Sequence, residues 1–366
     1  MLESQTYFVG LMSGTSLDGI DAVLVAFSDT ASHLIQSVYH PYPEELRQQL
    51  LALHTPSDNE LHTCAVVSSD LARRYASAVN ELLFKCSISA KAVTAIGVHG
   101  QTIRHQPDAG YTIQLNNPSL LTELTGITSI ADFRSRDIAA GGQGAPLVPA
   151  FHAAMFQHPE RHRVIVNIGG ISNLTNLPLS GNTIGFDCGP GNLLMDAWCL
   201  KHAGHPYDKN GDWAKSGVVI SELLQKLLSH SFFQQLPPKS AGRENFNLPW
   251  LMQFLSGNER PEDVQATLLE LTVKSIAEAI SKHCSGAEEI YLCGGGARNG
   301  TLLSSMQKTL SIQHVAPTDE LGVDADWLEA FAFAWLARQT SLGLAGNLPA
   351  VTGAKHPCIL GAIYPV

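Results

Sequence analysis

The chain has 366 residues, of which 45% are hydrophobic and 15% charged, and its formal net charge is −10. This length exceeds the size at which one hydrophobic core usually stops growing, so we expect two domains with a cleft between them. The negative charge disfavours nucleic acid and anionic membranes as partners, because their phosphates are repelled. The sequence carries no amino-terminal signal pattern and no apolar run of about 18 residues, so we expect a cytoplasmic location. The seven cysteines include no Cys-x-x-Cys pair, and we expect them to be reduced and mostly buried.

The first half of the chain alternates short apolar runs with longer helical patterns. Runs bounded by glycine or proline predict strands at residues 7–12, 21–27, 34–39, 93–98 and 111–115. Amphipathic spacing predicts helices near residues 44–53 and 59–84. A glycine-rich stretch at residues 139–146 interrupts the pattern, and a helix is expected from Leu147. We therefore expect a first domain of residues 1–138 plus about 350–366, and a second domain of residues 139–349.

The second half repeats this order of elements. Strands are predicted at residues 163–168, 172–177 and 183–186, and a helix follows Pro190. A long amphipathic helix at 262–284, a strand at 289–293 and a helix at 325–342 complete the chain. The similar order in both halves predicts an α/β protein with two related domains.

Three polar, glycine-rich loops each follow a predicted strand, and their recurrence indicates a nucleotide site. The first loop, residues 13–21, joins the two opening strands as a hairpin. Glycines let the backbone approach a phosphate closely, and hydroxyl groups add donors to its oxygens. Asp18 and Asp21 are reasonable partners for a hydrated magnesium ion, and we expect Asp18 to contact it through water. Taken alone, this loop is also compatible with a tight Gly/Asp/Ser turn.

The other two loops lie in the second half. Residues 167–173 join two strands through a glycine pair, and alone they are equally compatible with an ordinary hairpin. Residues 293–299 lead from a strand through three glycines into a helix, which places helix amides near an anion or a nucleotide. A helix start without a ligand is the plain alternative for this loop. The chain has no G-x-x-x-x-G-K-[ST] motif and no strand-linked G-x-G-x-x-G followed by an acid at the expected distance, which excludes P-loop enzymes and standard dinucleotide binders.

Five segments, in this order, carry a resemblance to a known family. They are residues 10–21 (GLMSGTSLDGID), 97–101 (GVHGQ), 131–138 (ADFRSRDI), 167–173 (NIGGISN) and 185–192 (GFDCGPGN). Together they resemble the anhydro-N-acetylmuramic acid kinase family of the actin, sugar-kinase and Hsp70 superfamily, from about Tyr7 to the C-terminus. Cys188 departs from the family pattern, which usually has threonine there. The resemblance implies a two-lobed, actin-like ATPase fold, made of duplicated ribonuclease H-like domains around a central cleft.

The resemblance also implies a reaction. Water would open the internal 1,6-anhydro bond of the sugar while ATP phosphorylates the freed 6-oxygen, giving N-acetylmuramic acid 6-phosphate and ADP. This chemistry needs a base that activates the water, and we expect Asp187 to be that base. We place Asp187 at a strand end, where the following helix N-terminus could hold it. Its alternative role is to cap that helix.

The sugar carries a lactyl carboxylate, which a guanidinium binds well. Arg134 and Arg136 are the candidates, and the resemblance favours Arg134; a surface ion pair with Asp132 or Asp137 is the alternative for either. For the hydroxyl and acetamido groups we expect His99, Gln101 and Asp132. His99 is equally compatible with a buried core histidine. The resemblance places Glu329 at the cleft, although a solvated helix position is nearly as compatible.

The resemblance implies the following ATP contacts. The phosphates would meet Gly14, Thr15, Ser16, Leu17, Asp18, Gly19, Ile20 and Asp21, together with Asn167, Gly169, Gly170 and Asn173, and the nucleoside would lie nearer Gly294, Gly295, Gly296 and Asn299. Mg²⁺ would bridge the phosphate oxygens. Kinases of this family tend to pair, so we expect a homodimer. Two other functions stay open from sequence: a sugar kinase of the same fold without ring hydrolysis, and a non-catalytic ATP-switched binding module.

Overall fold

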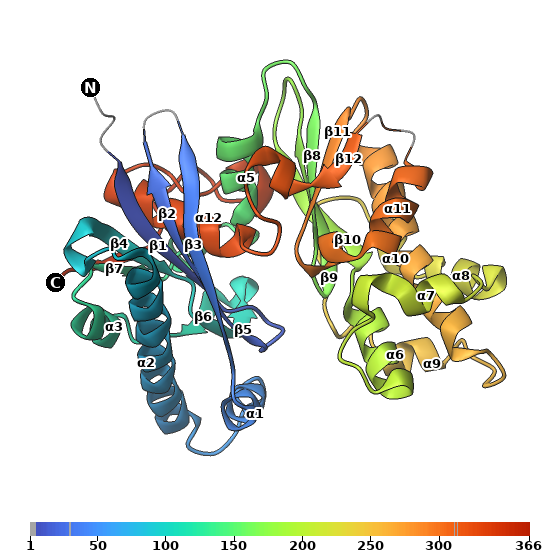
Figure 1. Ribbon diagram of the computed structural model, residues 1–366, viewed down its shortest axis with the longest axis horizontal. Coiled ribbons are helices and arrows are strands. Elements are labelled where there is room, and N and C mark those ends of the chain that lie inside the picture. Colours follow the sequence, from blue (N-terminus) through green and yellow to red (C-terminus); the bar gives the residue numbers. More distant parts are fainter. Residues whose placement is uncertain (1–4, 29–30, 311, 313) are drawn as a thin grey trace. The chain divides into compact units, whose positions relative to one another are not determined.

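The computed structural model describes residues 5–28, 31–310, 312 and 314–366 (Figure 1). The chain divides into two units, one of Met1–Phe151 with Trp327–Val366 and the other of His152–Asp326. The first unit therefore has two segments, as expected, but the boundaries differ from the expected residues 138 and 350. The first boundary falls within helix α5, Val148–Phe156, and the second precedes helix α12, Leu328–Ser341.

A six-stranded sheet forms the centre of the first unit, in the order β13-β7-β4-β1-β2-β3. Its strands are β1 (Thr6–Met12), β2 (Gly19–Phe27), β3 (Ser32–Pro41), β4 (Val93–Val98), β7 (Ser129–Ala131) and β13 (Ala362–Tyr364). β1, β2 and β3 are antiparallel neighbours, whereas β4 runs parallel to β1 and β7 parallel to β4. Strands β5 (Gln101–Gln106) and β6 (Tyr111–Leu115) form a separate two-stranded sheet. The predicted strands of this half are confirmed, and β5, β7 and β13 are additional.

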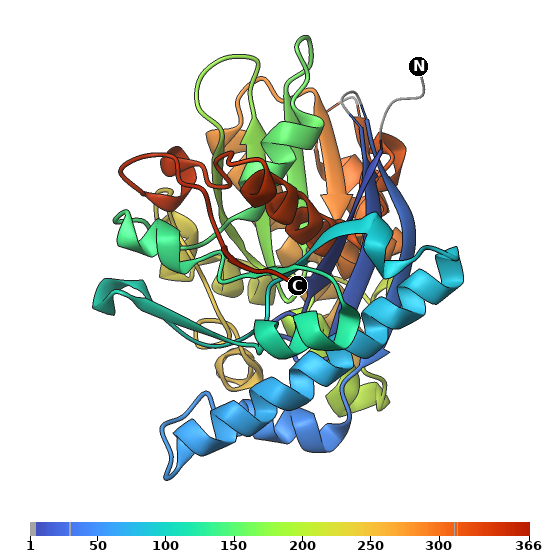
Figure 2. The same cartoon turned by 90° about the vertical axis from the view of Figure 1, so that its left-hand side faces the viewer.

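Helices cover both faces of this sheet. The long helix α2 (Glu60–Cys86) lies along β2 and β3 (Figures 1 and 2). Its buried residues Leu71 and Tyr75 share one hydrophobic cluster with Val9 and Leu11 of β1. Besides α12, the other helices of the unit are α1 (Glu44–Ala52), α3 (Pro118–Thr125), α4 (Ser135–Ala139) and α13 (Pro349–Thr352). Because successive strand residues point to opposite faces, Gly10 faces α12.

Two glycines explain why α12 belongs to the first unit. Gly10 and Gly97 are paired neighbours on β1 and β4. A Cβ on Gly10 would lie 1.9 Å from the Ala330 carbonyl oxygen, and one on Gly97 would lie 2.0 Å from that of Phe333. Only glycine permits this close approach of helix backbone to sheet. The contact holds α12 on the first sheet, so the unit resumes at Trp327 rather than near residue 350.

The second unit is built on a five-stranded sheet in the order β10-β9-β8-β11-β12. Its strands are β8 (Arg163–Ile168), β9 (Ile171–Leu177), β10 (Ile184–Pro190), β11 (Glu289–Cys293) and β12 (His314–Pro317). Its helices are α6 (Leu193–Ala203), α7 (Asp212–Ser216), α8 (Ser221–Leu228), α9 (Leu248–Met252), α10 (Pro261–His283) and α11 (Gly300–Thr309). β8, β9 and β10 are antiparallel neighbours, and β11 and β12 extend the sheet in parallel to β8. In the first unit, strands β3-β2-β1-β4-β7 have the same order and directions, so the expected duplicated α/β fold is confirmed.

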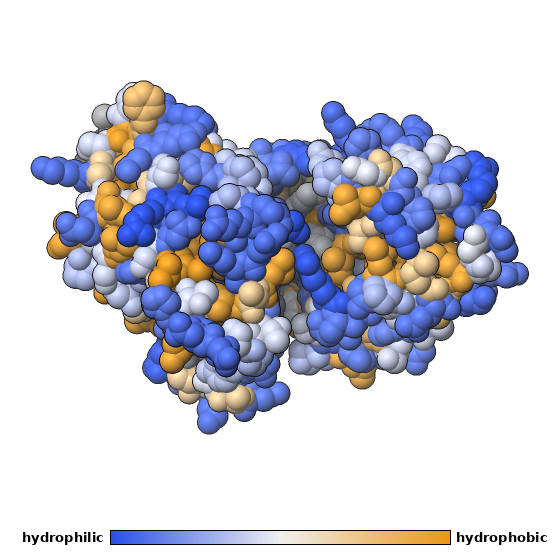
Figure 3. Space-filling view, turned by 90° about the horizontal axis from the view of Figure 1, so that it is seen from below, coloured by the Kyte–Doolittle hydropathy of each residue, from blue (hydrophilic) through white to orange (hydrophobic). Residues whose placement is uncertain are grey.

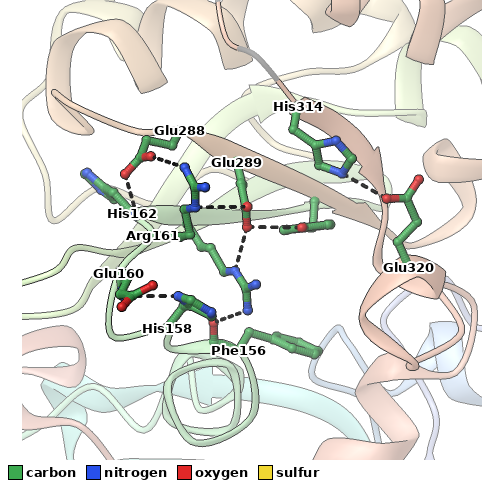
Figure 4. A network of polar contacts seen from close by, with 11 residues as sticks. Phe156, His158, Glu160, Arg161, His162, Glu288, Glu289, His314 and Glu320 are labelled. Carbon is green, nitrogen blue, oxygen red and sulfur yellow. Dashed lines mark hydrogen bonds and ion pairs between the residues drawn. The ribbon is translucent and has the colours of Figure 1, made fainter.

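Ion pairs join the amino-terminal ends of β8 and β11 (Figure 4). Arg163 and Glu289 are in register, and Arg163 Nε donates to Glu289 Oε2 at 2.8 Å. The Tyr291 hydroxyl donates to the same oxygen at 3.1 Å, and Arg161 Nη1 lies 2.8 Å from Glu288 Oε2. Because the two strands are parallel, their carboxyl ends lie at the opposite edge, where the second and third glycine-rich loops begin.

No helix in the described part of the chain combines the length and apolar character needed to cross a membrane. The face shown in Figure 3 carries apolar patches among hydrophilic residues. Five of the seven cysteines are buried, and Cys64 and Cys86 are partly exposed. The expectation that most cysteines are buried is therefore confirmed.

Candidate active site

The first glycine-rich loop is a hairpin turn between β1 and β2, as predicted. The Leu17 amide donates to the Gly14 carbonyl at 3.2 Å, so Thr15 and Ser16 form an exposed tip. Leu17 has a φ of 58°, in the left-handed region, which costs a non-glycine residue about 1–2 kcal/mol. Its side chain is 2% exposed, and this burial offsets the backbone strain. The core thus fixes the shape of a loop whose tip carries two hydroxyl groups.

Asp18 closes this turn. Its Oδ1 accepts from the Ser16 hydroxyl at 2.5 Å and from the Gly19 amide at 3.1 Å. Its carbonyl accepts from the Tyr39 hydroxyl at 2.9 Å. Burial and the negative charges of Asp18 and Asp21 raise the pKa of Tyr39 to about 12, so the hydroxyl keeps its proton. The Asp18 side chain is exposed, which leaves its carboxylate accessible to a hydrated cation.

A buried polar network holds the base of the same loop. Ser13 Oγ donates to the Gly100 carbonyl at 3.0 Å and accepts from the Tyr75 hydroxyl at 2.7 Å. Gln101 Nε2 donates to the Gly14 carbonyl at 3.0 Å, and the Gln101 side chain is fully buried. The amide of Gln101, which we expected to contact the sugar, is thus used by the loop backbone.

His99 has a similar structural role. Arg134 Nη2 lies 2.9 Å from His99 Nε2, and because a guanidinium can only donate, Nε2 is the acceptor. His99 Nδ1 therefore carries the proton and donates to the Ser13 carbonyl at 3.2 Å. Burial and the nearby charge of Arg134 lower the pKa of His99 to about 3, so the ring is neutral. His99 is buried and connects Arg134 to the first loop, while its contact with the sugar stays a prediction.

The remaining expected sugar residues lie near this pair. Arg134 is partly buried, and burial lowers its pKa to about 10, although the negative charges of Glu329 and Asp137 oppose the shift. Arg134 therefore stays protonated at neutral pH. Glu329 is partly buried at the start of α12, and burial raises its pKa although Arg134 opposes the rise. Asp132 is exposed with a φ of 58°, and its Oδ1 accepts from the Ser135 amide and hydroxyl. The described residues show no ion pair between Asp132 and an arginine. A cavity of about 260 Å³ is lined in part by His99, Gln114, Asn116, Asp132 and Ser135.

The second loop is the hairpin between β8 and β9, as predicted. The amides of Gly191 and Leu193 donate to the Gly170 carbonyl, and that of Asn192 donates to the Gly169 carbonyl at 2.7 Å. A Cβ on Gly191 would lie 2.3 Å from the Gly169 carbonyl oxygen, so only glycine permits this packing. The start of α6 is therefore bonded to the hairpin backbone.

Asp187 lies within β10 rather than at its end, which corrects our expectation. It pairs with Asn173, whereas Gly189 pairs with Ser172, so Cys188 is an extra residue in the ladder. A bulge of this kind redirects the neighbouring side chains, and bulges are frequent beside active sites. The buried position of Cys188 also explains why a small side chain is needed where the family usually has threonine.

The helix after Pro190 does not hold the Asp187 carboxylate, because its first amides are bonded to the second loop. Instead, Asp187 Oδ2 accepts from the Ala241 amide at 2.8 Å and from the Ser240 hydroxyl at 3.1 Å. Among the described residues no hydrogen bond involves Oδ1. Burial raises the pKa of Asp187, although the hydrogen bonds from Ala241 and Ser240 and the charge of Lys239 oppose the rise. The carboxylate is therefore held by one oxygen and has a second oxygen free to accept a proton.

Sequence reasoning missed the segment of residues 239–241. The Lys239 carbonyl accepts from the Asp187 amide at 3.1 Å, and Lys239 Nζ lies 4.4 Å from the centroid of the Phe232 ring. Ser240 is 53 residues from Asp187 along the chain, so no local spacing links them. The signal available was a polar, glycine-containing stretch, KSAGREN, between two helical patterns.

The third loop packs directly on the second. A Cβ on Gly294 would lie 2.3 Å from Asn167 Oδ1, and one on Gly296 would lie 2.3 Å from Ile168 Cγ2. The glycines lead into a short 3-10 turn, Gly295–Arg298, rather than straight into the helix. Asn299 then caps α11, accepting from the Leu302 amide at 3.0 Å. Asn299, which the resemblance places near the nucleoside, thus uses its side-chain oxygen for the cap.

A cavity of about 540 Å³ lies beside the start of α11. Its lining includes Asn210, Lys215, Glu270, Gly300, Thr301 and Lys308. The structure thus places the second loop, the third loop and this cavity along one side of the second unit, with Gly300 in its wall. Sequence reasoning had not singled out the lining residues.

Comparison with known proteins agrees with the resemblance. A family model described as anhydro-N-acetylmuramic acid kinase matches residues 6–366. A relative of that name from Nitrosospira multiformis is 62% identical over 361 residues, which cover 98% of this chain and 99% of the relative. Another from Nitrosomonas europaea is 58% identical over 361 residues, with 98% and 99% covered. The chain therefore belongs to the anhydro-N-acetylmuramic acid kinase family.

Proposed function

We propose that the protein uses ATP and water to convert 1,6-anhydro-N-acetylmuramic acid into N-acetylmuramic acid 6-phosphate and ADP. The observation that carries this proposal is the geometry of Asp187, whose Oδ2 is held by residues 240 and 241 while Oδ1 has no partner among the described residues. The names of the close relatives supply the substrate. Such a reaction belongs to the recycling of cell-wall amino sugars.

Asp187 is the general base of this mechanism. It takes a proton from a water molecule, whose oxygen bonds to the anomeric carbon of the sugar. The bond between that carbon and the 6-oxygen breaks, and the 6-oxygen attacks the γ-phosphorus of ATP. The bond from this phosphorus to the bridging oxygen of ADP breaks, so ADP leaves. The raised pKa of Asp187 favours this role, because a carboxylate with a higher pKa is a stronger base.

The glycine-rich loops bind ATP in this proposal. The exposed tip of Thr15 and Ser16 offers hydroxyl groups to the phosphates, and the glycine pair of the second loop allows close approach. The cavity of about 540 Å³ beside Gly300 is large enough for a nucleoside. Asp18 fits a magnesium ion held through water, because its carboxylate is exposed at the same loop. Mg²⁺ would neutralise charge on the phosphates during transfer.

Arg134 binds the lactyl carboxylate in this proposal. It is partly buried and oriented by His99 and by the Gly144 carbonyl, whereas Arg136 is exposed. A fixed guanidinium favours bidentate binding of a carboxylate. Asp132 and Glu329 supply acceptors for sugar hydroxyl groups.

Asp187→Asn tests the central step. The amide keeps the shape of the side chain but cannot take a proton, so turnover should fall at least about a hundredfold, while the KM values for ATP and sugar change little. Direct chromatography of ADP measures the rate. Asp58→Asn, in the exposed connection between α1 and α2, is the matched control and should keep normal turnover. Near-normal turnover of Asp187→Asn would refute the role of the base.

Heavy-oxygen water tests the ring opening separately. The proposed reaction places the label on the anomeric hydroxyl, and mass spectrometry of the product detects it. Transfer to an ordinary hydroxyl, as in a kinase without ring hydrolysis, leaves the product unlabelled. An unlabelled phosphosugar would therefore favour that alternative.

We also propose a homodimer that acts in the cytoplasm, where ATP is available, without a nucleic-acid or membrane partner. Exposed apolar side chains support the pairing: Leu61 and Phe84 of α2 are 83% and 85% exposed. Light scattering at micromolar concentration checks the oligomeric state. A mass of a single subunit, 39.3 kDa, would contradict the dimer.

A further inference from the structure

Asp137 is a fully buried carboxylate three positions after Arg134. Its Oδ1 accepts from Asn347 Nδ2 at 2.6 Å and from the Thr352 hydroxyl at 2.7 Å. Its Oδ2 accepts from the Gly144 amide at 2.7 Å. Asp137 is thus not a surface ion-pair partner, as sequence reasoning allowed, but the centre of a buried network.

The network continues to Arg134. A Cβ on Gly142 would lie 2.2 Å from Asp137 Oδ2, so residues 142–144 wrap closely around the carboxylate. Gly144 links the two residues through its own backbone: its amide donates to Asp137 Oδ2, and its carbonyl, in the next peptide unit, accepts from Arg134 Nη1 at 2.8 Å. The opposite edge of the guanidinium, Nε and Nη2, donates to His99. Arg134 is therefore held from two sides.

These bonds leave part of the guanidinium available. Nη1 and Nη2 each carry two N–H groups, and each makes one hydrogen bond to a described residue. The remaining N–H groups can bind a carboxylate only if the plane of the guanidinium is fixed, because bidentate pairing depends on orientation. Asp137 holds Gly144, whose carbonyl accepts from Nη1 and so helps to fix the plane of the Arg134 guanidinium.

We propose that Asp137 is a positioning residue for the sugar carboxylate: it fixes the Gly144 carbonyl, which in turn orients Arg134. This inference rests on the proposed function, in which Arg134 binds the lactyl group. Asp137 does not touch the substrate. Its carboxylate also joins α4 to residues 347–352, so a change there affects stability as well as binding.

The test compares two ligands that differ only in the lactyl group. We expect Asp137→Asn to weaken binding of 1,6-anhydro-N-acetylmuramic acid about tenfold, the effect of one impaired charged pair, in calorimetric titration. The affinity for 1,6-anhydro-N-acetylglucosamine, which has no carboxylate, should stay within about twofold. A residue that only stabilises the fold would change both affinities alike or neither, and that result would overturn the proposal.

Two further variants keep the test decisive. Arg134→Ala should abolish the difference between the ligands, and adding Asp137→Asn to it should have no further effect, since coupled residues are not additive. Thr352→Val removes one donor to Asp137 and is the milder variant if Asp137→Asn does not fold. It should weaken binding of the ligand with the lactyl carboxylate roughly twofold and leave the affinity for the other ligand unchanged. Equal loss for both ligands in Thr352→Val would overturn the proposal. Thr340→Val, which removes a buried hydroxyl bonded to the Leu360 carbonyl, is the matched control and should change neither affinity.

The proposed function fails in a different way. If the wild-type protein binds neither anhydro sugar, or phosphorylates neither, the substrate assignment is wrong before any variant is compared. If the wild-type protein binds both equally and Arg134→Ala has no effect, the role of Arg134 fails. If Arg134→Ala shows a ligand-selective loss and Asp137→Asn does not, the role of Asp137 fails while that of Arg134 stands.

Discussion

Ser240→Ala should change the pH dependence of turnover through Asp187. The hydroxyl donates to Oδ2 at 3.1 Å and stabilises the ionised carboxylate, so it holds the pKa of Asp187 down. Removing it raises that pKa. In the proposed mechanism the ionised form is the active base, so the acid limb of the kcat profile should move to higher pH.

The structure limits the size of this change. Hydrogen bonds to charged groups contribute about 1.5–3 kcal/mol, but Ser240 is exposed and water replaces part of the lost bond. The Ala241 amide, at 2.8 Å, still bonds the same oxygen. We therefore expect a loss of about 0.7 kcal/mol, which moves the acid limb by roughly half a pH unit.

The assay measures kcat at saturating ATP and sugar from mildly acidic to neutral pH. Ser240→Thr keeps the hydroxyl and should retain the wild-type profile. Ser229→Ala removes an exposed hydroxyl that donates to the Lys226 carbonyl at the end of α8, and it should also leave the profile unchanged. If Ser240→Ala lowers kcat equally at every pH, Ser240 affects the geometry of Asp187 and not its charge, and the reasoning is refuted.

Two further changes test the supports of the second unit. Glu289→Gln should lower stability by about 1–3 kcal/mol at neutral pH in thermal melts, because Arg163 loses a partly buried charged partner. Burial raises the pKa of Glu289, but hydrogen bonds from Arg163 and Tyr291 outweigh it and the net pKa is lowered. A carboxyl group whose pKa is lower in the folded state contributes its full stabilisation at pH values above the pKa of the unfolded chain, about 4.3. The difference in stability between wild type and variant should therefore vanish as the pH falls through the folded-state pKa; a constant difference would contradict this. Gly191→Ala should lower stability by about 1–3 kcal/mol and raise the KM for ATP, because its Cβ would lie 2.3 Å from the Gly169 carbonyl oxygen; unchanged melts and KM would contradict this.

The long strands and helices were predictable from local pattern. β1, β8 and α10 each carry enough apolar positions for their periodicity to show. β7 and β13 have three residues each, too few for any pattern, and they exist because neighbouring segments pair with them. The domain boundaries could not be predicted from the sequence either. Helix α12 joins the first sheet through close contacts with Gly10 and Gly97, which are far from it along the chain.

The site was predictable in part. The three loops stand where the glycines indicated. In the first loop a Cβ on Gly19 would lie 2.5 Å from the His40 carbonyl oxygen, and in the third loop one on Gly294 would lie 2.3 Å from Asn167 Oδ1, so glycine is needed at both positions. The partners of Asp187 were not predictable, since Ser240 reaches it only through the tertiary fold. Sequence also could not show whether a polar residue in a motif faces a ligand or the protein. His99 Nδ1 and Gln101 Nε2 donate to carbonyls of the first loop, a use that the sequence pattern did not indicate.

This distinction separates the motif residues into two groups with different consequences. His99, Gln101 and Asn299 use their polar atoms on backbone groups, so changing them alters the shape of a loop and affects every ligand of that loop. Asp187 and Arg134 are oriented by the protein but keep polar atoms without a described partner. Only such groups can accept a proton or bind a carboxylate directly. In the proposed function the specific chemistry therefore depends on Asp187 and Arg134, and their neighbours determine how accurately each is placed.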